Sequence, residues 1–185
     1  DSVFSVPNTV RVGTYRRMIH EMTEMQMANL GQYAHGNQPI QHAIYLYNYA
    51  GTPWKAQQKV REVMKKLYNA TENGYPGDED QGQTSSWYVL SALGFYSVCP
   101  STDQYVFGSP IFEKTTITME NGKRFVIEAE NNNSENVYIR SAKLNGKEYS
   151  KNYIRYRDII NGGNLVFEMN NQPNLQRGTL PEDMP

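Results

Sequence analysis

Three carboxylates in a row, Asp78-Glu79-Asp80, lie in the densest polar stretch of this sequence, and Gly77 and Gly82 lie on either side of them. Adjacent carboxylates repel one another and need a positive charge nearby. A helix N-terminus or a bound cation supplies that charge. The triplet therefore predicts carboxylates held for acid–base or metal chemistry, or alternatively an ordinary acidic turn with an aspartate N-cap.

A second polar stretch runs from His35 to His42 and contains Gly36, Asn37 and Gln38. Amide oxygens suit a hard cation or sugar hydroxyls, and a glycine permits close approach of the backbone. An ordinary turn between two helices, in which the asparagine caps the next helix, explains the same residues. Both interpretations stay open at this point.

His35 and Trp87 are candidate substrate-binding residues. The flat face of an indole suits the C–H face of a sugar ring. A tryptophan on a helix with Val89 and Leu90 close behind it is also typical of a buried core position, which is the alternative.

Composition limits the classes of protein to which this chain can belong. Its 185 residues carry 18 Lys and Arg against 19 Asp and Glu, which argues against a nucleic-acid binder or a polybasic membrane binder. No run of about 18 apolar residues is present, so no transmembrane segment is expected. The single cysteine, Cys99, has no partner for an internal disulfide.

The hydrophobic pattern predicts helices in the first part and strands after about residue 105. Spacings of three and four residues predict helices over 15–30, 40–50, from 53 onward and over 82–93. Alternation predicts strands over 115–119, 124–129, 137–144, 148–149 and 165–169. Asn121-Gly122 and Asn145-Gly146 predict type I′ hairpin turns, hence an antiparallel sheet. The fold class is therefore α+β. The helices could form a bundle or part of a larger α/α barrel.

Two long stretches of the sequence resemble glycoside hydrolase family 92. The family's G-N-E-P motif is similar to Gly36-Asn37-Gln38-Pro39, and its Y-L-Y-N-Y-x-G-x-P-W motif is similar to the stretch from Ile44 to Trp54. The stretch from Gly74 to Gln83, G-Y-P-G-D-E-D-Q-G-Q, resembles another. The likeness covers roughly residues 15–178, and the motifs occur in the same order as in the family.

The resemblance implies a fold and an activity for the whole protein. Family members are calcium-dependent exo-α-mannosidases, many act on α-1,2 linkages, and they invert the anomeric centre. Their β-sandwich precedes an (α/α)6 barrel, so this chain would be the C-terminal part. Residues 1–104 would supply the last barrel helices, 105–175 a small antiparallel β region and 176–185 an extended tail. The partners would be an α-mannoside or N-glycan and the N-terminal remainder of the polypeptide. A secreted, periplasmic or cell-surface bacterial protein is expected.

The resemblance also implies roles for individual residues. Asp80 would be the general base that activates water, Asp78 would assist it, and Asn37, Gln38 and Asp80 would lie at the calcium site. A base must be ionised, which a helix N-terminus and a nearby cation favour. The family has Glu where this chain has Gln38, so one negative charge is missing. The general-acid Glu would lie upstream, which predicts that the isolated chain is inactive.

A non-catalytic carbohydrate-binding or structural module is the alternative function. The tyrosines of the strand-rich part support it: Tyr138, Tyr149, Tyr153 and Tyr156. Tyrosines in hairpins usually pack across strands, which favours a structural support over a binding surface.

Overall fold

The computed structural model describes all 185 residues and has an α+β fold. Its backbone contacts divide the chain into two compact units. The first unit comprises residues 1–41 and 62–88, and the second comprises 42–61 and 89–185. This division differs from the predicted boundary near residue 105, which concerns the place of the chain in a larger enzyme and stays a prediction. No helix is both long and apolar enough to cross a membrane.

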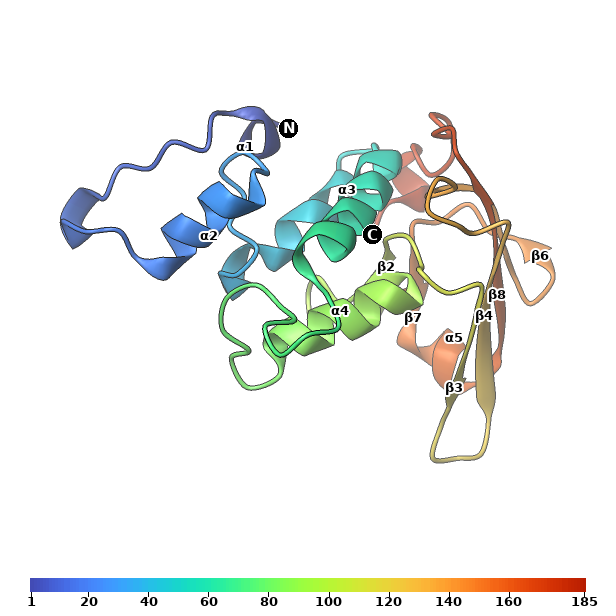
Figure 1. Ribbon diagram of the computed structural model, residues 1–185. Helices are drawn as coiled ribbons and strands as arrows, with labels where there is room; N and C mark the ends of the chain where they lie inside the picture. The colour runs from blue at the N-terminus through green and yellow to red at the C-terminus, as the bar shows by residue number, and fades with distance from the viewer. The chain divides into compact units, whose positions relative to one another are not determined.

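The first unit contains the N-terminal helices (Figure 1). Helix α1 covers Ser2–Ser5, a 3₁₀ turn η1 covers Gly13–Tyr15, and α2 covers His20–Ala28. The predicted helix over 15–30 is therefore shorter at both ends. Asn29 ends it by adopting a left-handed φ of 49°, two residues before the glycine expected to do so.

Three further helical segments carry residues of both units. The predicted α-helix over 40–50 is wrong in type, because η2, at Gln38–Tyr47, is a 3₁₀ helix. Helix α3 covers Pro53–Leu67 and begins at the proline, as predicted. Helix α4 covers Gln83–Leu93 and is followed by Gly94 at φ 105°, which confirms the fourth predicted helix and its stop.

The second unit holds two sheets. The order of the first is β1-β2-β7, from Phe95–Tyr96, Gln104–Phe107 and Tyr153–Arg155, none of which the sequence predicted. The order of the second is β3-β4-β8-β5-β6, built from Lys114–Thr118, Arg124–Glu130, Gly163–Asn170, Tyr138–Leu144 and Lys147–Glu148. Helix α5, at Tyr156–Ile160, precedes β8.

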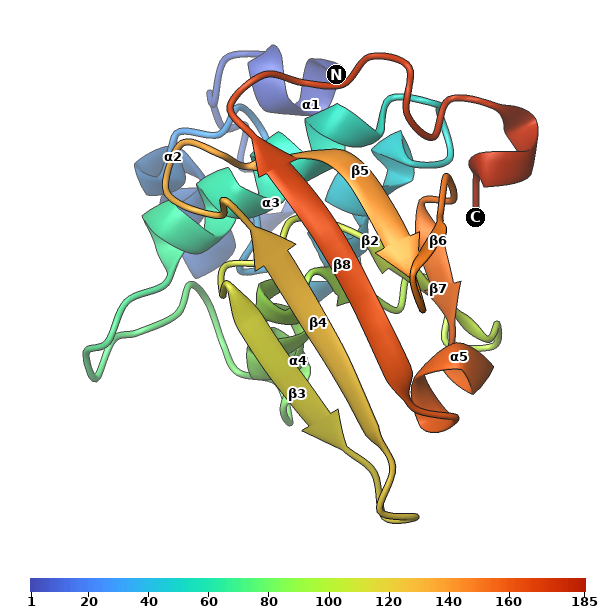
Figure 2. The ribbon, with the colours of Figure 1, turned by 90° about the vertical axis from the view of Figure 1, so that its right-hand side faces the viewer.

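The expectation of a purely antiparallel sheet is wrong. Strands β4 and β8 run parallel, with Ile127 opposite Leu165, and their arrows point the same way in Figure 2. All other pairs are antiparallel. The chain reaches the parallel position through β5, β6, β7 and α5, because a parallel neighbour needs a long crossover.

Alternate residues of β4 and β8 form the centre of the second unit's core. Phe125 and Ile127 are buried along β4, and Leu165 and Phe167 along β8. Residues two apart in a strand share one face, so the parallel pair buries one continuous apolar face. The core of the larger sheet therefore follows the predicted alternation, although the direction of one pair differs.

The two predicted hairpin turns have different outcomes. Asn145 and Gly146 both have positive φ, 52° and 78°, which confirms a two-residue type I′ turn between β5 and β6. In the β3–β4 hairpin only Gly122 has positive φ. Its N–H donates to the carbonyl of Met119, which is typical of a longer loop with a left-handed glycine.

The closing segment, residues 176–185, is not simply extended as predicted. Residues Pro181–Asp183 form the 3₁₀ turn η3, and Asp183 is buried. The backbone N–H of Asn152 donates to the Asp183 carbonyl, and the Asn152 side chain donates to the carbonyl of Gly178. These bonds join the end of the chain to the rest of the second unit at Gly178 and Asp183.

Candidate functional site

One hydrogen bond joins the two polar stretches that the sequence analysis singled out. The side-chain amide of Gln38 donates from Nε2 to the backbone carbonyl of Asp78 over 2.8 Å. The hydroxyl of Thr84, at the start of α4, donates to the same carbonyl over 2.9 Å. The Asp78 carbonyl is therefore fixed from two sides, and all three residues belong to the first unit.

Two glycines allow the loops to approach this closely. A β-carbon on Gly77 would lie 2.5 Å from the carbonyl oxygen of Gly36 and 2.7 Å from its Cα. A β-carbon on Gly36 would lie 3.0 Å from the Gly77 Cα and would overlap the Glu24 carboxylate. Gly77 also has a φ of 69°, a conformation that side chains disfavour. No larger residue fits at either position without moving a loop.

The two predicted catalytic aspartates lie on the exposed side of this arrangement. Asp78 has a side chain 72% exposed, and its Oδ2 lies 3.6 Å from Nε2 of His20. Asp80 is also exposed and has a left-handed φ of 48°. Its backbone carbonyl accepts a hydrogen bond from the N–H of Gln83, the first residue of α4. Both carboxylates are therefore open to solvent, as groups that meet a substrate or water must be.

Glu79 has a different role from its neighbours. Its carboxylate accepts hydrogen bonds from the backbone N–H of Ser85 at 3.1 Å and from the Ser85 hydroxyl at 2.5 Å. The Ser85 N–H is one of the free donors in the first turn of α4. The alternative interpretation of this turn expected an aspartate N-cap, but a glutamate satisfies this donor.

His35 is buried, and both of its ring nitrogens have partners. Nδ1 lies 2.7 Å from the hydroxyl of Tyr33, and Nε2 lies 2.8 Å from that of Tyr68. Loss of solvation lowers the pKa of His35 to about 3, so the ring is neutral at physiological pH. In the structure its ring links the hydroxyl of Tyr33 to that of Tyr68. Its predicted contact with substrate stays a prediction.

Trp87 is fully buried beside this histidine. The His35 ring packs edge-on against it with centroids 4.3 Å apart, and the Tyr68 ring stacks on it at 5.8 Å. Its indole N–H donates to the carbonyl of Gln41. This environment favours the core position given above as the alternative, while the predicted contact with a sugar stays untested.

The residues predicted for calcium offer suitable donors but an incomplete set. Gln38 uses its Nε2 for the bond to Asp78, and its Oε1 accepts no hydrogen bond within the chain. Asn37 and Asp80 are exposed and add an amide oxygen and a carboxylate. Hard cations such as Ca²⁺ take six to eight oxygen ligands. No group of three His, Cys, Asp or Glu side chains in the chain could hold a metal. The donors therefore fit part of a calcium site.

Glu24 is a residue of this site that the sequence analysis did not identify. Its Oε2 is buried without a hydrogen-bond partner. Desolvation raises its pKa, while the charge of His20 acts in the opposite direction. Its place on a helix of ordinary spacing gave no signal, because only the fold brings it against Gly36.

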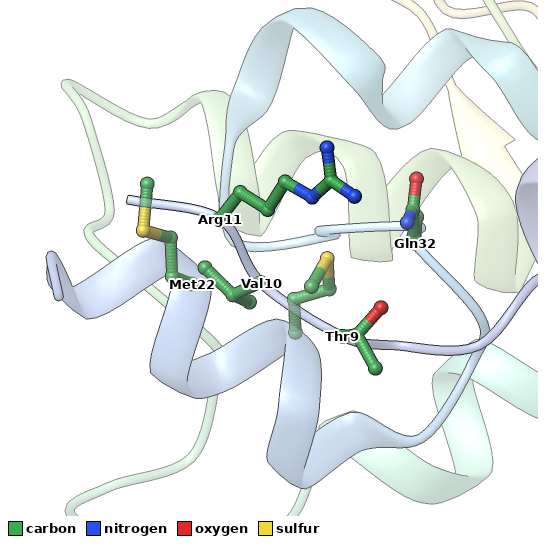
Figure 3. A pocket seen from close by; sticks show the side chains of 6 residues that line it. Thr9, Val10, Arg11, Met22 and Gln32 are labelled. Carbon is green, nitrogen blue, oxygen red and sulfur yellow. The ribbon is translucent and has the colours of Figure 1, made fainter. Parts of the chain in front are cut away.

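Two hollows in the first unit lie apart from the predicted residues. The residues that line the first include Thr9, Val10, Arg11, Met22 and Gln32, which Figure 3 labels, and Met25. The second is lined by residues of α2 and α3 and by the approach to the acidic triplet, among them Glu24, Lys66 and Tyr75. Neither is lined by Asp78, Asp80, Asn37 or Gln38.

Tyrosines of the second unit mostly support its structure. The Tyr149 hydroxyl donates to the Tyr153 carbonyl, and its ring faces Phe107. Tyr153 is buried, whereas Tyr156 is 53% exposed. These contacts favour the structural role over a carbohydrate-binding surface.

Comparison with known proteins gives the family. The protein-family model for the glycosyl hydrolase family 92 catalytic domain matches residues 1–171 of this chain. An uncharacterized secreted glycosidase from the fungus Arthroderma benhamiae is 34% identical over 153 residues, which are 81% of this chain and 20% of that protein.

Two solved structures from Bacteroides thetaiotaomicron are similar to the chain. The first, a family 92 inverting mannosidase, is 55% identical with a TM-score of 0.84, and the match covers 100% of this chain and 25% of that one. The second, a family 92 alpha-mannosidase in complex with mannoimidazole, is 40% identical with a TM-score of 0.82 over 85% of this chain and 21% of that one. The chain thus spans a fifth to a quarter of these relatives, and it belongs to glycosyl hydrolase family 92.

Proposed function

We propose that the protein containing this chain is an inverting, calcium-dependent α-mannosidase that releases mannose from α-1,2-linked mannosides of the N-glycan type. Membership of the family and the similarity to an inverting mannosidase and an alpha-mannosidase from Bacteroides thetaiotaomicron support the proposal. The observation that carries it is the hydrogen bond from Gln38 to Asp78, which brings the two polar stretches together.

In this proposal Asp80 is the general base. Its carboxylate takes a proton from a water molecule as the water oxygen attacks the anomeric carbon, and the glycosidic bond breaks on the opposite side. Asp78 assists by holding the same water. The leaving oxygen would take its proton from an acid group outside this chain, which the family resemblance implies and which we include in the proposal. An inverting enzyme needs the two groups about 6.5–9.5 Å apart to leave room for the water.

Asn37, Gln38 and Asp80 would hold calcium together with ligands from elsewhere in the protein. The ion would supply a fixed positive charge that binds the 2- and 3-hydroxyls of the mannose and favours a distorted ring. Gln38 is suited to both tasks, because its amide nitrogen binds the Asp78 loop while its amide oxygen is left for a ligand. His35 and Trp87 would support the sugar-binding side of the loop from within.

Membership of the same family supports a proposal for the setting of the chain. We propose that residues 1–104 belong to the last helices of an (α/α)6 barrel, that 105–175 form a β region beside it and that 176–185 close the domain. We propose a secreted, periplasmic or cell-surface location, which the Arthroderma benhamiae relative described as secreted supports. A bacterial source is part of the proposal. The upstream position of the acid predicts that the isolated chain releases no mannose.

The test is Asp80→Ala in the full-length enzyme, assayed on an α-1,2-mannobiose. Loss of a general base typically lowers the rate by about 10²–10⁴-fold. Glu72→Ala, at an exposed glutamate on the loop after α3, is the matched control and should retain full activity. Activity of Asp80→Ala within tenfold of wild type would reject the base assignment.

A further inference from the structure

Glu79 is fastened to helix α4 by both its side chain and its main chain. Its carboxylate accepts from the N–H and the hydroxyl of Ser85, at 3.1 and 2.5 Å. Its backbone carbonyl accepts from the N–H of Thr84 over 3.2 Å. These contacts close the residues between Glu79 and Thr84 into a short loop on the long connection between α3 and α4 (Figure 1).

The backbone inside this loop is strained. Asp80, Gln81 and Gly82 have consecutive positive φ values of 48°, 58° and 92°. Residues that carry a β-carbon disfavour this region, and aspartate tolerates it better than most. Two such residues in succession persist only where the surrounding structure holds them. The contacts of Glu79 with Thr84 and Ser85 span the strained segment, and so does the hydrogen bond from the Thr84 hydroxyl to the Asp78 carbonyl. Only the Glu79 contacts include a carboxylate.

We propose that Glu79 is a positioning residue, whose carboxylate holds the first turn of α4 and thereby fixes the left-handed backbone that aims Asp80. The proposal rests on the proposed function, because it needs Asp80 to act on the substrate. The three carboxylates then divide the work: the outer two face solvent, and the middle one supports them. A misplacement of a reacting group by about 1 Å can cost about 10²-fold in rate.

The first test compares Glu79→Ala with Glu79→Gln in the full-length enzyme. Glutamine keeps an oxygen that accepts from the Ser85 N–H, whereas alanine keeps none. We expect Glu79→Ala to lower kcat about 30- to 100-fold with KM within threefold, and Glu79→Gln to recover to within about fivefold of wild type. Glu72→Ala controls for the loss of an acidic side chain. Equal losses in the Gln and Ala variants, or an unchanged kcat in the Ala variant, would overturn the proposal.

The second test does not depend on activity. Hydrogen exchange of the peptide covering residues 79–86 should quicken at least tenfold in Glu79→Ala and stay near wild type in Glu79→Gln. If Asp80→Ala proves fully active, the proposed function fails, yet this exchange still shows whether Glu79 holds the segment. Unchanged exchange in Glu79→Ala would overturn the positioning role.

A third variant covers the case in which Glu79→Ala does not fold. Ser85→Ala removes the hydroxyl bond and leaves the backbone donor in place. It should give the same pattern at reduced size, a threefold to tenfold loss in kcat with unchanged KM. Ser85→Ala at wild-type kcat with unchanged exchange would count against the proposal.

Discussion

The side chain of Gln38 donates a 2.8 Å hydrogen bond to the main chain of Asp78, forty residues away in the sequence. The bond brings a predicted metal ligand and a predicted catalytic loop into one unit. It also gives the amide of Gln38 a use at the position where the family motif has a glutamate. An ionised carboxylate at this position could not donate to the carbonyl.

Restoring the family's residue should therefore exchange one interaction for another. Gln38→Glu loses the donor to Asp78 and places a negative charge beside a carbonyl, which should cost about 1–3 kcal/mol when no cation is bound. We expect a lower melting temperature than wild type in EGTA and a larger rise on addition of calcium. Thermal unfolding of the full-length protein in both buffers measures this difference.

Gln38→Met is the control for this comparison. It removes the donor without adding a charge, so its melting temperature should fall in EGTA and recover less with calcium than that of Gln38→Glu. Equal calcium responses in the two variants would show that position 38 does not contact the cation.

The contact between Gly36 and Gly77 should tolerate no side chain. Gly77→Ala combines a strained φ of 69° with a β-carbon 2.5 Å from a backbone oxygen. Gly122→Ala is the matched control, because its φ is 77° but nothing lies within 4 Å of the added carbon. The control should cost about 1–2 kcal/mol for the left-handed backbone alone. We expect a clearly larger loss of stability in Gly77→Ala, together with reduced mannoside hydrolysis. Similar melting temperatures for the two variants would mean that the loops can separate without cost.

The buried histidine should make the first unit sensitive to acid. The pKa of His35 is about 6.5 in the unfolded chain and is lowered to about 3 in the folded one by burial. Between these values the unfolded chain binds a proton that the folded chain does not. Stability is therefore full above pH 6.5 and falls by about 1.4 kcal/mol for each pH unit below it.

His35→Gln removes this titration. We expect it to be less stable than wild type at pH 7.5 but to lose less melting temperature between pH 7.5 and pH 5. His42→Gln, a substitution at a half-buried histidine seven residues on, should keep the acid loss of the wild type. Parallel pH profiles for wild type and His35→Gln would show that His35 is not the group responsible.

Local patterns predicted the elements whose signals lie in adjacent residues. Pro53 begins α3, Gly94 follows the last residue of α4, and Asn145-Gly146 forms the expected type I′ turn. Each of these features depends only on the backbone preferences of the residues that form it. The alternation along β4 and β8 was equally visible. Their parallel pairing was not, since one strand's pattern does not carry the direction of its neighbour.

The site divides in the same way. The sequence motifs around Gln38 and Asp80 identified the two loops and the family. The close approach of Gly36 to Gly77 and to Glu24 joins segments far apart in the sequence, which no local pattern records. The hydrogen bond of Glu79 to Ser85 is local, but a run of three carboxylates does not show which of them makes it. For His35, the sequence pattern identified the residue but not its environment. Its position in a polar stretch did not indicate that the ring is buried with both nitrogens bonded to tyrosine hydroxyls.

Arg177 should be the main anchor of the closing segment. Its guanidinium donates to the Asn152 side chain and to the carbonyls of Tyr149 and Lys151, and burial lowers its pKa to about 10. The charge of Asp183 acts in the opposite direction on this pKa. Arg177→Ala leaves these acceptors and a buried carboxylate without their cation, which should cost about 3–5 kcal/mol.

Arg140→Ala provides the contrast for that prediction. Arg140 pairs with Glu168 over 3.2 Å at the surface, where such pairs contribute about 0–1 kcal/mol. Thermal unfolding of the full-length protein should separate the two variants clearly, with Arg177→Lys between them, because a lysine keeps the charge but not the planar fork that reaches three acceptors. If Arg177→Ala melts within a degree of Arg140→Ala, the closing segment is held by its backbone hydrogen bonds and the guanidinium is dispensable.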